Sequence, residues 1–228
     1  MSVDFDAYQS SYREEVERSI SFSGQDVDFF AEVKAHALLG LARRRIGDPA
    51  GLRALDVGCG VGVTDRHLAG RFGELHGVDI TPGVIEQARR SNPGVAYEVY
   101  DGRRLPYDDG ALDLAFTICV LHHIPVAGRA AFAAEVARVV RPGGLFAIFE
   151  HNPLNPLTRR AVDHCEFDAD AVLLPRRESV ALLRGAGLEV VERPFITFFP
   201  FGGARLRRFE RLLGRLPLGA QYFVAGRR

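Results

Sequence analysis

The chain has 228 residues, and its 29 basic and 29 acidic side chains balance to a formal net charge of zero. Neutral charge argues against a protein that mainly coats nucleic acid, because that role needs a broad basic surface. No apolar run approaches the roughly 18 residues of a membrane span, and the acidic N-terminus is unlike a secretory signal. Three widely spaced cysteines argue against a disulfide framework. We therefore expect a cytoplasmic protein.

The first 50 residues are predicted to form a helical lead-in, because apolar residues recur at helical spacing across residues 26–38. From residue 53 onward, apolar runs alternate with helix-like stretches, which is typical of a mostly parallel sheet with crossover helices. The predicted strands are Arg53–Val57, Leu75–Ile80, Ala96–Tyr100, Leu112–Val120, Leu145–Glu150, Leu188–Pro194 and Gln221–Gly226. The predicted helices are Val63–Phe72, Pro82–Arg90, Val126–Val140 and Glu178–Gly185.

Three segments need separate treatment. The sequence Arg141-Pro142-Gly143-Gly144 is expected to end the third helix and turn the chain into the next strand. Residues 152–174 and 201–218 do not fit the alternation, and we expect them to form insertions on the substrate side. The pattern as a whole predicts a doubly wound α/β fold.

A glycine-rich turn follows the first predicted strand, in the segment Leu55-Asp56-Val57-Gly58-Cys59-Gly60-Val61-Gly62. Glycines there let the backbone approach a ligand and expose the amides of the next helix. Asp79 ends the second predicted strand, where a carboxylate can accept hydrogen bonds from both hydroxyls of a ribose. Asp101, after the third strand, could receive the exocyclic amine of an adenine. A nicotinamide dinucleotide fits less well, because the third small residue of its G-x-G-x-x-G/A fingerprint would fall on Val63.

At these residues the sequence resembles the class I S-adenosylmethionine-dependent methyltransferases. The matching segments span about residues 50–151 in the family's order and spacing. They are Leu55–Gly62, Gly77-Val78-Asp79-Ile80, Asp101-Gly102 with Leu105-Pro106-Tyr107, Leu121-His122-His123-Ile124 and Val140-Arg141-Pro142-Gly143-Gly144.

The resemblance implies a Rossmann-like sheet of seven strands whose last strand is antiparallel, with S-adenosylmethionine across the carboxyl ends of the first four. It implies one methyltransferase domain over residues 1–228, in which residues 1–50 form a lead-in or lid, 51–151 the cofactor-binding core and 152–228 the substrate-side insertions and last strands. The implied cofactor contacts are Asp56, then Gly58, Gly60 and Gly62 around the methionine end, Asp79 on the ribose, Ile80 on the adenine, Asp101 and Gly102 at its amino group, and Thr117 and His122 at the pocket border. Tyr8 and Tyr12 are candidates for a lid over the methionine end or for ordinary packing tyrosines.

Methyl transfer from a sulfonium depends mainly on aligning the acceptor with the methyl group, and an oxygen acceptor also has to lose a proton. Histidine suits that task because its pKa lies near neutrality. His122 and His123 follow the fourth predicted strand and His151 follows the fifth, beside Glu150. We expect His122 to line the pocket, His122 or His123 to be a candidate base, and His151 to be a candidate substrate contact.

No metal site is expected, because His151, His164, Cys165 and Glu166 lack the usual ligand spacing. The Asn/Asp-Pro-Pro-aromatic motif of many DNA methyltransferases is absent after the fourth strand, so nucleic acid is not an expected partner.

Residues 201–228 carry seven arginines and one glutamate, and residues 205–215 read as a basic amphipathic helix. The segment 201–215 could therefore contact a membrane or a lipid-linked substrate, or simply pack on the sheet. Glu150–Leu174 and Pro217–Val224 also resemble segments of bacterial methyltransferases of cell-surface glycan or secondary-metabolite pathways.

These observations predict S-adenosylmethionine-dependent methylation of a small molecule, such as a sugar, lipid-linked glycan or natural-product hydroxyl. A cofactor-binding protein without catalysis and a nicotinamide-dependent oxidoreductase remain the alternatives.

Overall fold

The computed structural model describes residues 12–199, 210 and 212–228, with the backbone alone for residues 12–15. Its strands form one sheet in the order β3-β2-β1-β4-β5-β8-β6, and β7 also pairs with β8. The strands are β1 (Arg53–Val57), β2 (Glu74–Asp79), β3 (Ala96–Val99), β4 (Leu112–Ile118), β5 (Val140–His151), β6 (Glu189–Glu192), β7 (Phe195–Ile196) and β8 (Gln221–Arg227). The first five strands are parallel, whereas β8 runs antiparallel to its neighbours. The predicted α/β fold with an antiparallel last strand is therefore confirmed.

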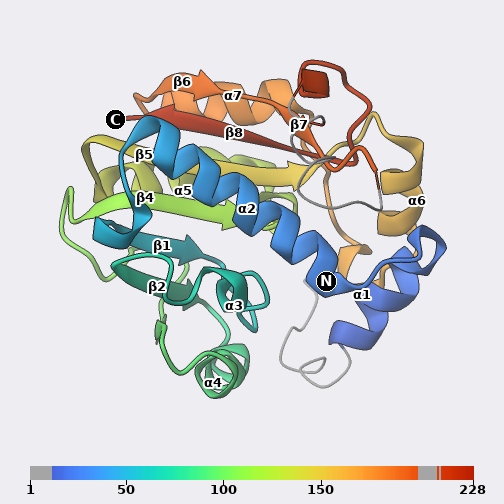
Figure 1. The fold of residues 1–228 in the computed structure, drawn as a ribbon, viewed down its shortest axis with the longest axis horizontal. Coiled ribbons are helices and arrows are strands. Elements are labelled where there is room, and N and C mark those ends of the chain that lie inside the picture. The colour runs from blue at the N-terminus through green and yellow to red at the C-terminus, as the bar shows by residue number, and fades with distance from the viewer. Residues whose placement is uncertain (1–11, 200–209, 211) are drawn as a thin grey trace.

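The described helices cover both faces of this sheet. They are α1 (Tyr12–Ile20), α2 (Val27–Arg45), α3 (Asp65–Leu68), α4 (Pro82–Ser91), α5 (Val126–Val139), α6 (Pro156–Asp163) and α7 (Arg176–Gly185). Helix α2 crosses one face, and α5 and α7 lie behind the other (Figure 1). Together with the sheet they form the layered arrangement of a doubly wound fold.

Strand alternation explains how both faces become hydrophobic cores. Along β5, Leu145, Ala147 and Phe149 pack in the cluster that contains the apolar side of α2. The intervening Phe146 and Ile148 pack with α5 and α7 instead. Because successive strand residues point to opposite faces, a continuous apolar run is what a strand buried on both sides requires.

Two predicted elements differ in extent from the structure. The helix expected over Val63–Phe72 is the four-residue α3, because Ala69 leaves the helical conformation (ψ 130°) and Gly70 adopts φ +69°. The strand expected over Leu188–Pro194 is the shorter β6, and a separate strand, β7, follows it; the two pair with β8 on either side of Pro194. Proline has no N–H to donate, so the pairing is interrupted there and the sheet has eight strands instead of seven.

The Pro-Gly-Gly segment ends the helix as predicted, but it lies inside β5. Helix α5 ends at Val139 and the strand begins at the next residue. The register then shifts between the pairs Leu112↔Val140 and Leu114↔Leu145, so the intervening residues bulge from the edge. Gly143 adopts φ +80° in this bulge, a conformation that glycine tolerates best.

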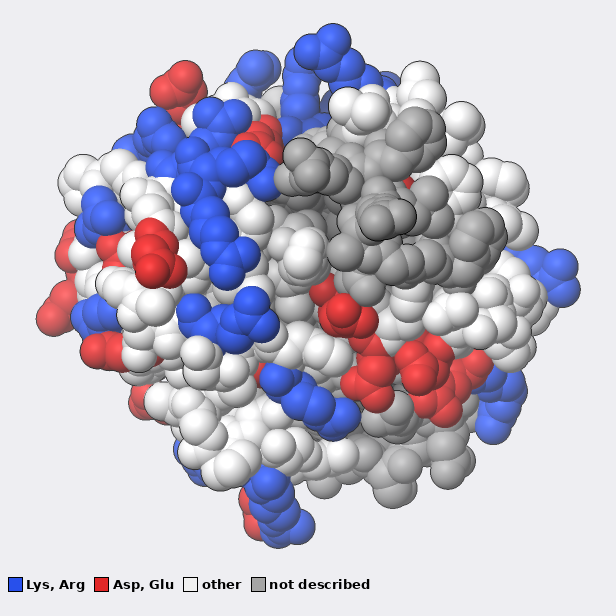
Figure 2. All heavy atoms as spheres, in the orientation of Figure 1, with Lys and Arg blue, Asp and Glu red and all other residues white. Residues whose placement is uncertain are grey.

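The carboxyl ends of the parallel strands meet α1 and α6 on one side of the molecule (Figure 1). Helix α2 begins at an acidic first turn and ends in Arg43, Arg44 and Arg45, which complements its dipole. Figure 2 shows the corresponding basic patch over the C-terminal half of α2 and acidic side chains toward its start. Among the described residues, no helix is long and apolar enough to cross a membrane.

Candidate active site

A cavity of about 1280 Å³ lies at the carboxyl edge of the sheet. Ligand pockets commonly measure roughly 300–1,000 Å³, so this one has room for two bound molecules. Its walls come from α1 and α2, the glycine loop, the end of β2, the turn after β4, the segment 155–168 and the strand ends at 197–198 and 220–221. Open α/β sheets bind ligands at this edge.

The three glycines of the loop have different surroundings. Gly60 has φ +52°, lines the cavity, and a Cβ there would meet no atom within 4 Å. Gly58 also lines the cavity, with φ +81°, but its Cβ would come within 2.6 Å of the Val120 side chain. Gly62 is not among the lining residues. A Cβ at Gly62 would lie 2.5 Å from both Asn92 and Tyr97, so its glycine is explained by packing beneath the loop.

Asp79 lines the cavity at the end of β2, as the sequence predicts. Its carboxylate accepts hydrogen bonds from the backbone amides of Gly60 and Thr81, each at 3.0 Å. Burial raises its pKa, although these two hydrogen bonds favour the ionised form. Ile80 follows with 57% of its surface exposed, beside Gly102, and both line the cavity. The Asp79 carboxylate can accept hydrogen bonds from a diol here, and the Ile80 side chain can pack against an adjacent flat ring.

Asp56 lines the cavity at the end of β1 and is buried together with Asp65 of α3. Neither Oδ1 atom has a hydrogen-bond partner among the described residues. Burial and the charge of Asp65 raise the pKa of Asp56 well above its usual range, and burial raises the pKa of Asp65 to about 6. Two adjacent buried carboxyls favour one shared proton, which leaves a single negative charge beside the cavity. An ammonium group would be stabilised there.

Lys34 of α2, the only lysine of the chain, lines the same cavity. It makes no ion pair with any residue that the structure describes, and its charge favours the ionised forms of Asp56 and Cys119. From the sequence alone, a single lysine beside 28 arginines indicates a bias of base composition, whereas the structure places Lys34 in the cavity wall. Lys34 and the Asp56–Asp65 pair together offer opposite charges to a zwitterionic group.

Three predicted cofactor contacts do not line the cavity. The first is Gly62, described above. The second, Asp101, is exposed and accepts hydrogen bonds from the amides of Arg103 and Arg104 at 2.8 Å. Thr117 is fully buried and donates to the carbonyl of Val57 at 2.9 Å.

Other predictions fall outside the described part of the chain. Tyr8 lies outside the described residues, and so does the side chain of Tyr12 at the start of α1. Most of the predicted basic helix over 205–215 also lies outside them.

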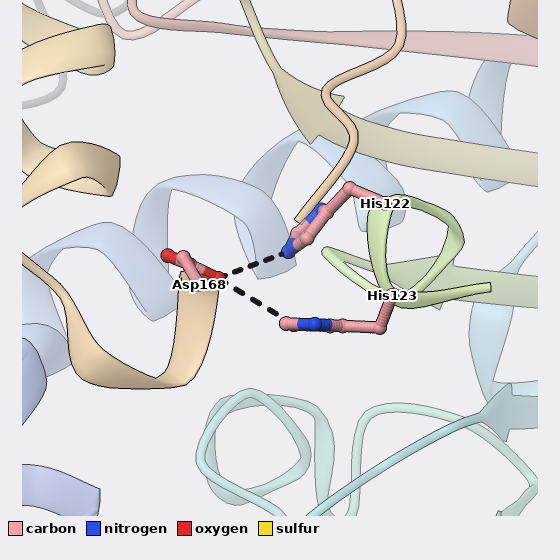
Figure 3. A group of neighbouring side chains, drawn as sticks. All are labelled: His122, His123 and Asp168. Carbon is pink, nitrogen blue, oxygen red and sulfur yellow. Dashed lines mark ion pairs between the residues drawn. The ribbon is translucent and has the colours of Figure 1, made fainter. Parts of the chain in front are cut away.

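Histidines line the cavity at the ends of β4 and β5, with carboxylates beside them, whereas the glycine loop and Asp79 lie at the ends of β1 and β2; the strand order therefore separates the two groups along the sheet. The Nδ1 atom of His122 lies 2.6 Å from Oε2 of Glu150, whose Oε1 accepts the amide of Leu121 at 2.8 Å. The Nε2 atoms of His122 and His123 lie 3.3 and 3.5 Å from Oδ1 of Asp168. Figure 3 marks both ion pairs with dashed lines. Asp168 comes from the segment 152–174, which the sequence marked only as an insertion. The three histidines predicted from the sequence all line the cavity, and the ring of His151 lies 5.3 Å from that of His122.

The electrostatic environment separates these histidines. Burial lowers the pKa of His122, but attraction to Glu150 and hydrogen bonds to Asp168 and Glu150 outweigh it and raise the pKa well above the usual value. Burial and the charge on His122 lower the pKa of His123 and of His151 to about 4. At neutral pH one imidazolium is thus held between two carboxylates, beside two neutral imidazoles.

One group of described side chains has the geometry of a metal site: the ligand atoms of His122, His123 and Asp168 all lie within 4.8 Å of one another. The set weighed from the sequence, His151 with His164, Cys165 and Glu166, does not form such a group. Ion pairing already accounts for the contacts of His122, whose two nitrogens face two carboxylates. The absence of a metal site stays a prediction.

Residues 55–148 match the family model of the methyltransferase domain. Methyltransferase GfsG of Streptomyces halstedii is 32% identical over 185 residues, covering 75% of this chain and 66% of that protein. The 2-methyl-6-phytyl-1,4-hydroquinone methyltransferase of Synechocystis sp. is 33% identical over 138 residues, covering 54% and 43%. The chain thus spans less than two thirds of the length of these curated relatives.

Solved structures agree in fold. A SAM-dependent methyltransferase from Thermotoga maritima superposes with a TM-score of 0.68 at 19% identity, covering 98% of this chain and 97% of that one.

Proposed function

Because this chain contains the domain of the class I S-adenosylmethionine-dependent methyltransferases, we propose that it transfers a methyl group to a hydroxyl of a small molecule. The observation that carries the proposal is a single cavity with cofactor-type groups at one end and the Glu150–His122–Asp168 chain at the other.

The residues at the glycine-loop end fit S-adenosylmethionine, the cofactor of this family. The Asp56–Asp65 pair and Lys34 supply opposite charges for the amino and carboxylate groups of the methionine part, and Gly60 leaves open space in the cavity wall. Asp79 would hold the ribose hydroxyls, and Ile80 would pack on the adenine. When bound, the cofactor supplies an electrophilic methyl group on a positively charged sulfur.

His122 is the residue we assign to proton removal from the acceptor. Glu150 fixes the orientation of the ring through Nδ1, which leaves Nε2 toward Asp168 and the cavity. As the acceptor oxygen forms its bond to the methyl carbon, the hydroxyl proton would pass to Nε2 of His122. The electron pair of the breaking carbon–sulfur bond would stay with the sulfur. The raised pKa makes His122 a stronger base than an ordinary histidine, but it has to lose its resting proton first. His123 and His151, with pKa values of about 4, would be neutral polar side chains in the cavity wall.

A hydroxyl acceptor explains why the cavity needs a general base at His122. A neutral amine could attack the methyl group through its free lone pair, whereas an alcohol becomes a competent nucleophile as its proton is removed. The relatives' names cover different acceptors: a hydroquinone and a tocopherol, and also norajmaline and ajmaline, whose enzymes are named N-methyltransferases. The candidate base is therefore what favours a hydroxyl here. For this chain we propose a sugar, glycan or natural-product hydroxyl.

The test is transfer of radiolabel from S-[methyl-³H]adenosylmethionine to a panel of nucleotide sugars, alkyl glycosides and polyphenols. We expect label in at least one hydroxyl compound and stoichiometric formation of S-adenosylhomocysteine. Tight binding of S-adenosylhomocysteine without transfer to any compound would favour a non-catalytic cofactor-binding protein. Binding of NADH in its place would favour an oxidoreductase.

A further inference from the structure

The end of the cavity beside His151 contains two buried polar atoms without partners. Gln221 is 6% exposed and Thr197 is 5% exposed, and both line the cavity. Neither Oε1 of Gln221 nor Oγ1 of Thr197 has a hydrogen-bond partner among the described residues. A buried polar atom without a hydrogen-bond partner costs free energy. Such atoms in a binding cavity therefore indicate a ligand that forms the missing hydrogen bonds.

Sheet register places these atoms next to the proposed chemistry. Gln221 begins β8 and lies directly opposite His151 in the antiparallel β5–β8 pair. Opposite residues of an antiparallel pair have their side chains on the same face. On its other side Gln221 pairs with Ile196 of β7, and Thr197 follows directly. The carbonyl of Thr197 accepts the amide of Ala220 at 2.9 Å, which fixes the two segments together.

Backbone strain also occurs at this place. Thr197 and Cys119 are the non-glycine residues with positive φ in the described part of the chain, at +61° and +57°. Both line the cavity, and the Gln221 amide lies 3.8 Å from the sulfur of Cys119. Such conformations cost free energy and concentrate at functional sites, here holding a β-branched hydroxyl residue in a cavity wall.

We propose that Gln221 and Thr197 form an acceptor-recognition subsite that binds a second hydroxyl, adjacent to the one that is methylated. The inference rests on the proposed methyl transfer and names its substrate class, a vicinal diol such as a sugar ring. An amide oxygen and a hydroxyl together complement a neutral group that both donates and accepts a hydrogen bond. Neither residue is charged, so a hydroxyl suits the pair better than a carboxylate, whose burial needs a countercharge.

The test uses cis-1,2-cyclohexanediol and cyclohexanol as minimal probes, with affinities measured by NMR titration of protein saturated with S-adenosylhomocysteine. A neutral hydrogen bond changes affinity by roughly two- to tenfold, so we expect the diol to bind at least threefold more tightly. The preference should disappear in Gln221→Leu and weaken in Thr197→Val, which keeps the shape of the side chain. Ser19→Ala is the matched control, because Ser19 also lines the cavity but donates to Val16 within its own helix.

Equal affinity of the two probes for the unmodified protein, no binding of either, or a preference retained in Gln221→Leu would each overturn the proposal. Calorimetry with S-adenosylhomocysteine separates the subsite from the cofactor site. Unchanged affinity in Gln221→Leu supports an acceptor role and shows that the variant is folded, whereas weaker binding in a variant that keeps its melting temperature would assign the residue to the cofactor. No S-adenosylhomocysteine binding to the unmodified protein would contradict the proposed function itself, whatever the probes show.

Discussion

The two ends of the cavity are built in different ways. Apart from Lys34, the cofactor end depends on the continuous segment 56–60 and on Asp79, which reaches it directly from the neighbouring strand. The acceptor end assembles side chains far apart in sequence, from His122 and Glu150 through Asp168 to Gln221. Backbone conformation thus sets the first end, whereas long-range side-chain contacts set the second. Changes at the first should alter cofactor affinity, and changes at the second should alter turnover.

The largest expected effect is that of His122→Gln on methyl transfer. General-base catalysis contributes roughly 10²–10⁴-fold, so kcat with the acceptor identified by the radiolabel assay should fall by about that factor. Glutamine can still donate to Glu150, so the buried carboxylate keeps a partner and the affinity for S-adenosylhomocysteine should be unchanged. The matched variant His123→Gln should lose less than tenfold. An equal loss in both variants would remove His122 from the role of base.

Asp79→Ala should weaken cofactor binding. Loss of two charge-assisted contacts to the ribose should cost about 1.5–3 kcal/mol per bond in affinity for S-adenosylhomocysteine. Asp79 also accepts the backbone amides of Gly60 and Thr81, so the free energy of unfolding should fall by about 1–3 kcal/mol as well. Calorimetry at a temperature where the variant is folded measures the first quantity, and denaturant unfolding measures the second. Undiminished affinity would contradict the assignment of Asp79 to the ribose.

A pair of glycine variants should divide the loop into ligand-facing and packing positions. Gly62→Ala places a methyl group 2.5 Å from Asn92 and Tyr97 at φ +72°, so we expect a loss of about 1–3 kcal/mol in the free energy of unfolding. Gly60→Ala has comparable backbone strain at φ +52° but meets no atom within 4 Å, so it should lose less stability and should weaken cofactor binding more. Denaturant unfolding and calorimetry should therefore rank the two variants in opposite orders. The same order in both measurements would show that the loop does not divide in this way.

The smallest effect is a shift in pH dependence. Attraction to Glu150 and hydrogen bonds to Asp168 and Glu150 raise the pKa of His122, and only its neutral form can accept a proton. We therefore expect kcat/KM to rise with pH through an apparent pKa above 6.5, where His122 deprotonates. In Asp168→Asn the imidazolium loses one of these partners, so the rising limb should move to lower pH. A rising limb that stays at the same pH, or moves to higher pH, would show that Asp168 does not raise the pKa of His122.

The fold and the cofactor end were largely predictable from the sequence. Gly58 and Gly60 follow the first predicted strand and Asp79 lies at the end of the second, so local pattern alone places them at one edge. The acceptor end was predictable only in part. His122, His123 and His151 could be placed at strand ends, which is where they lie.

The contacts between those histidines and the rest of the chain could not be predicted. Asp168 reaches His122 from a segment without a periodic pattern, and Gln221 faces His151 only through the register of an antiparallel strand. Gly62 is a residue for which the sequence predicts too much. It matches the cofactor-binding motif, but a glycine is required there because Asn92 and Tyr97 pack against it. Sequence spacing identifies a glycine but does not distinguish a ligand from a neighbouring side chain as the reason for it.

Parallel calorimetric titration with S-adenosylhomocysteine and NADH tests the central claim most directly, since everything proposed here depends on which cofactor the glycine-loop end binds. We predict binding of S-adenosylhomocysteine in the micromolar range and no heat from NADH. Binding of NADH, or of neither compound, would contradict the assignment of this cavity to methyl transfer.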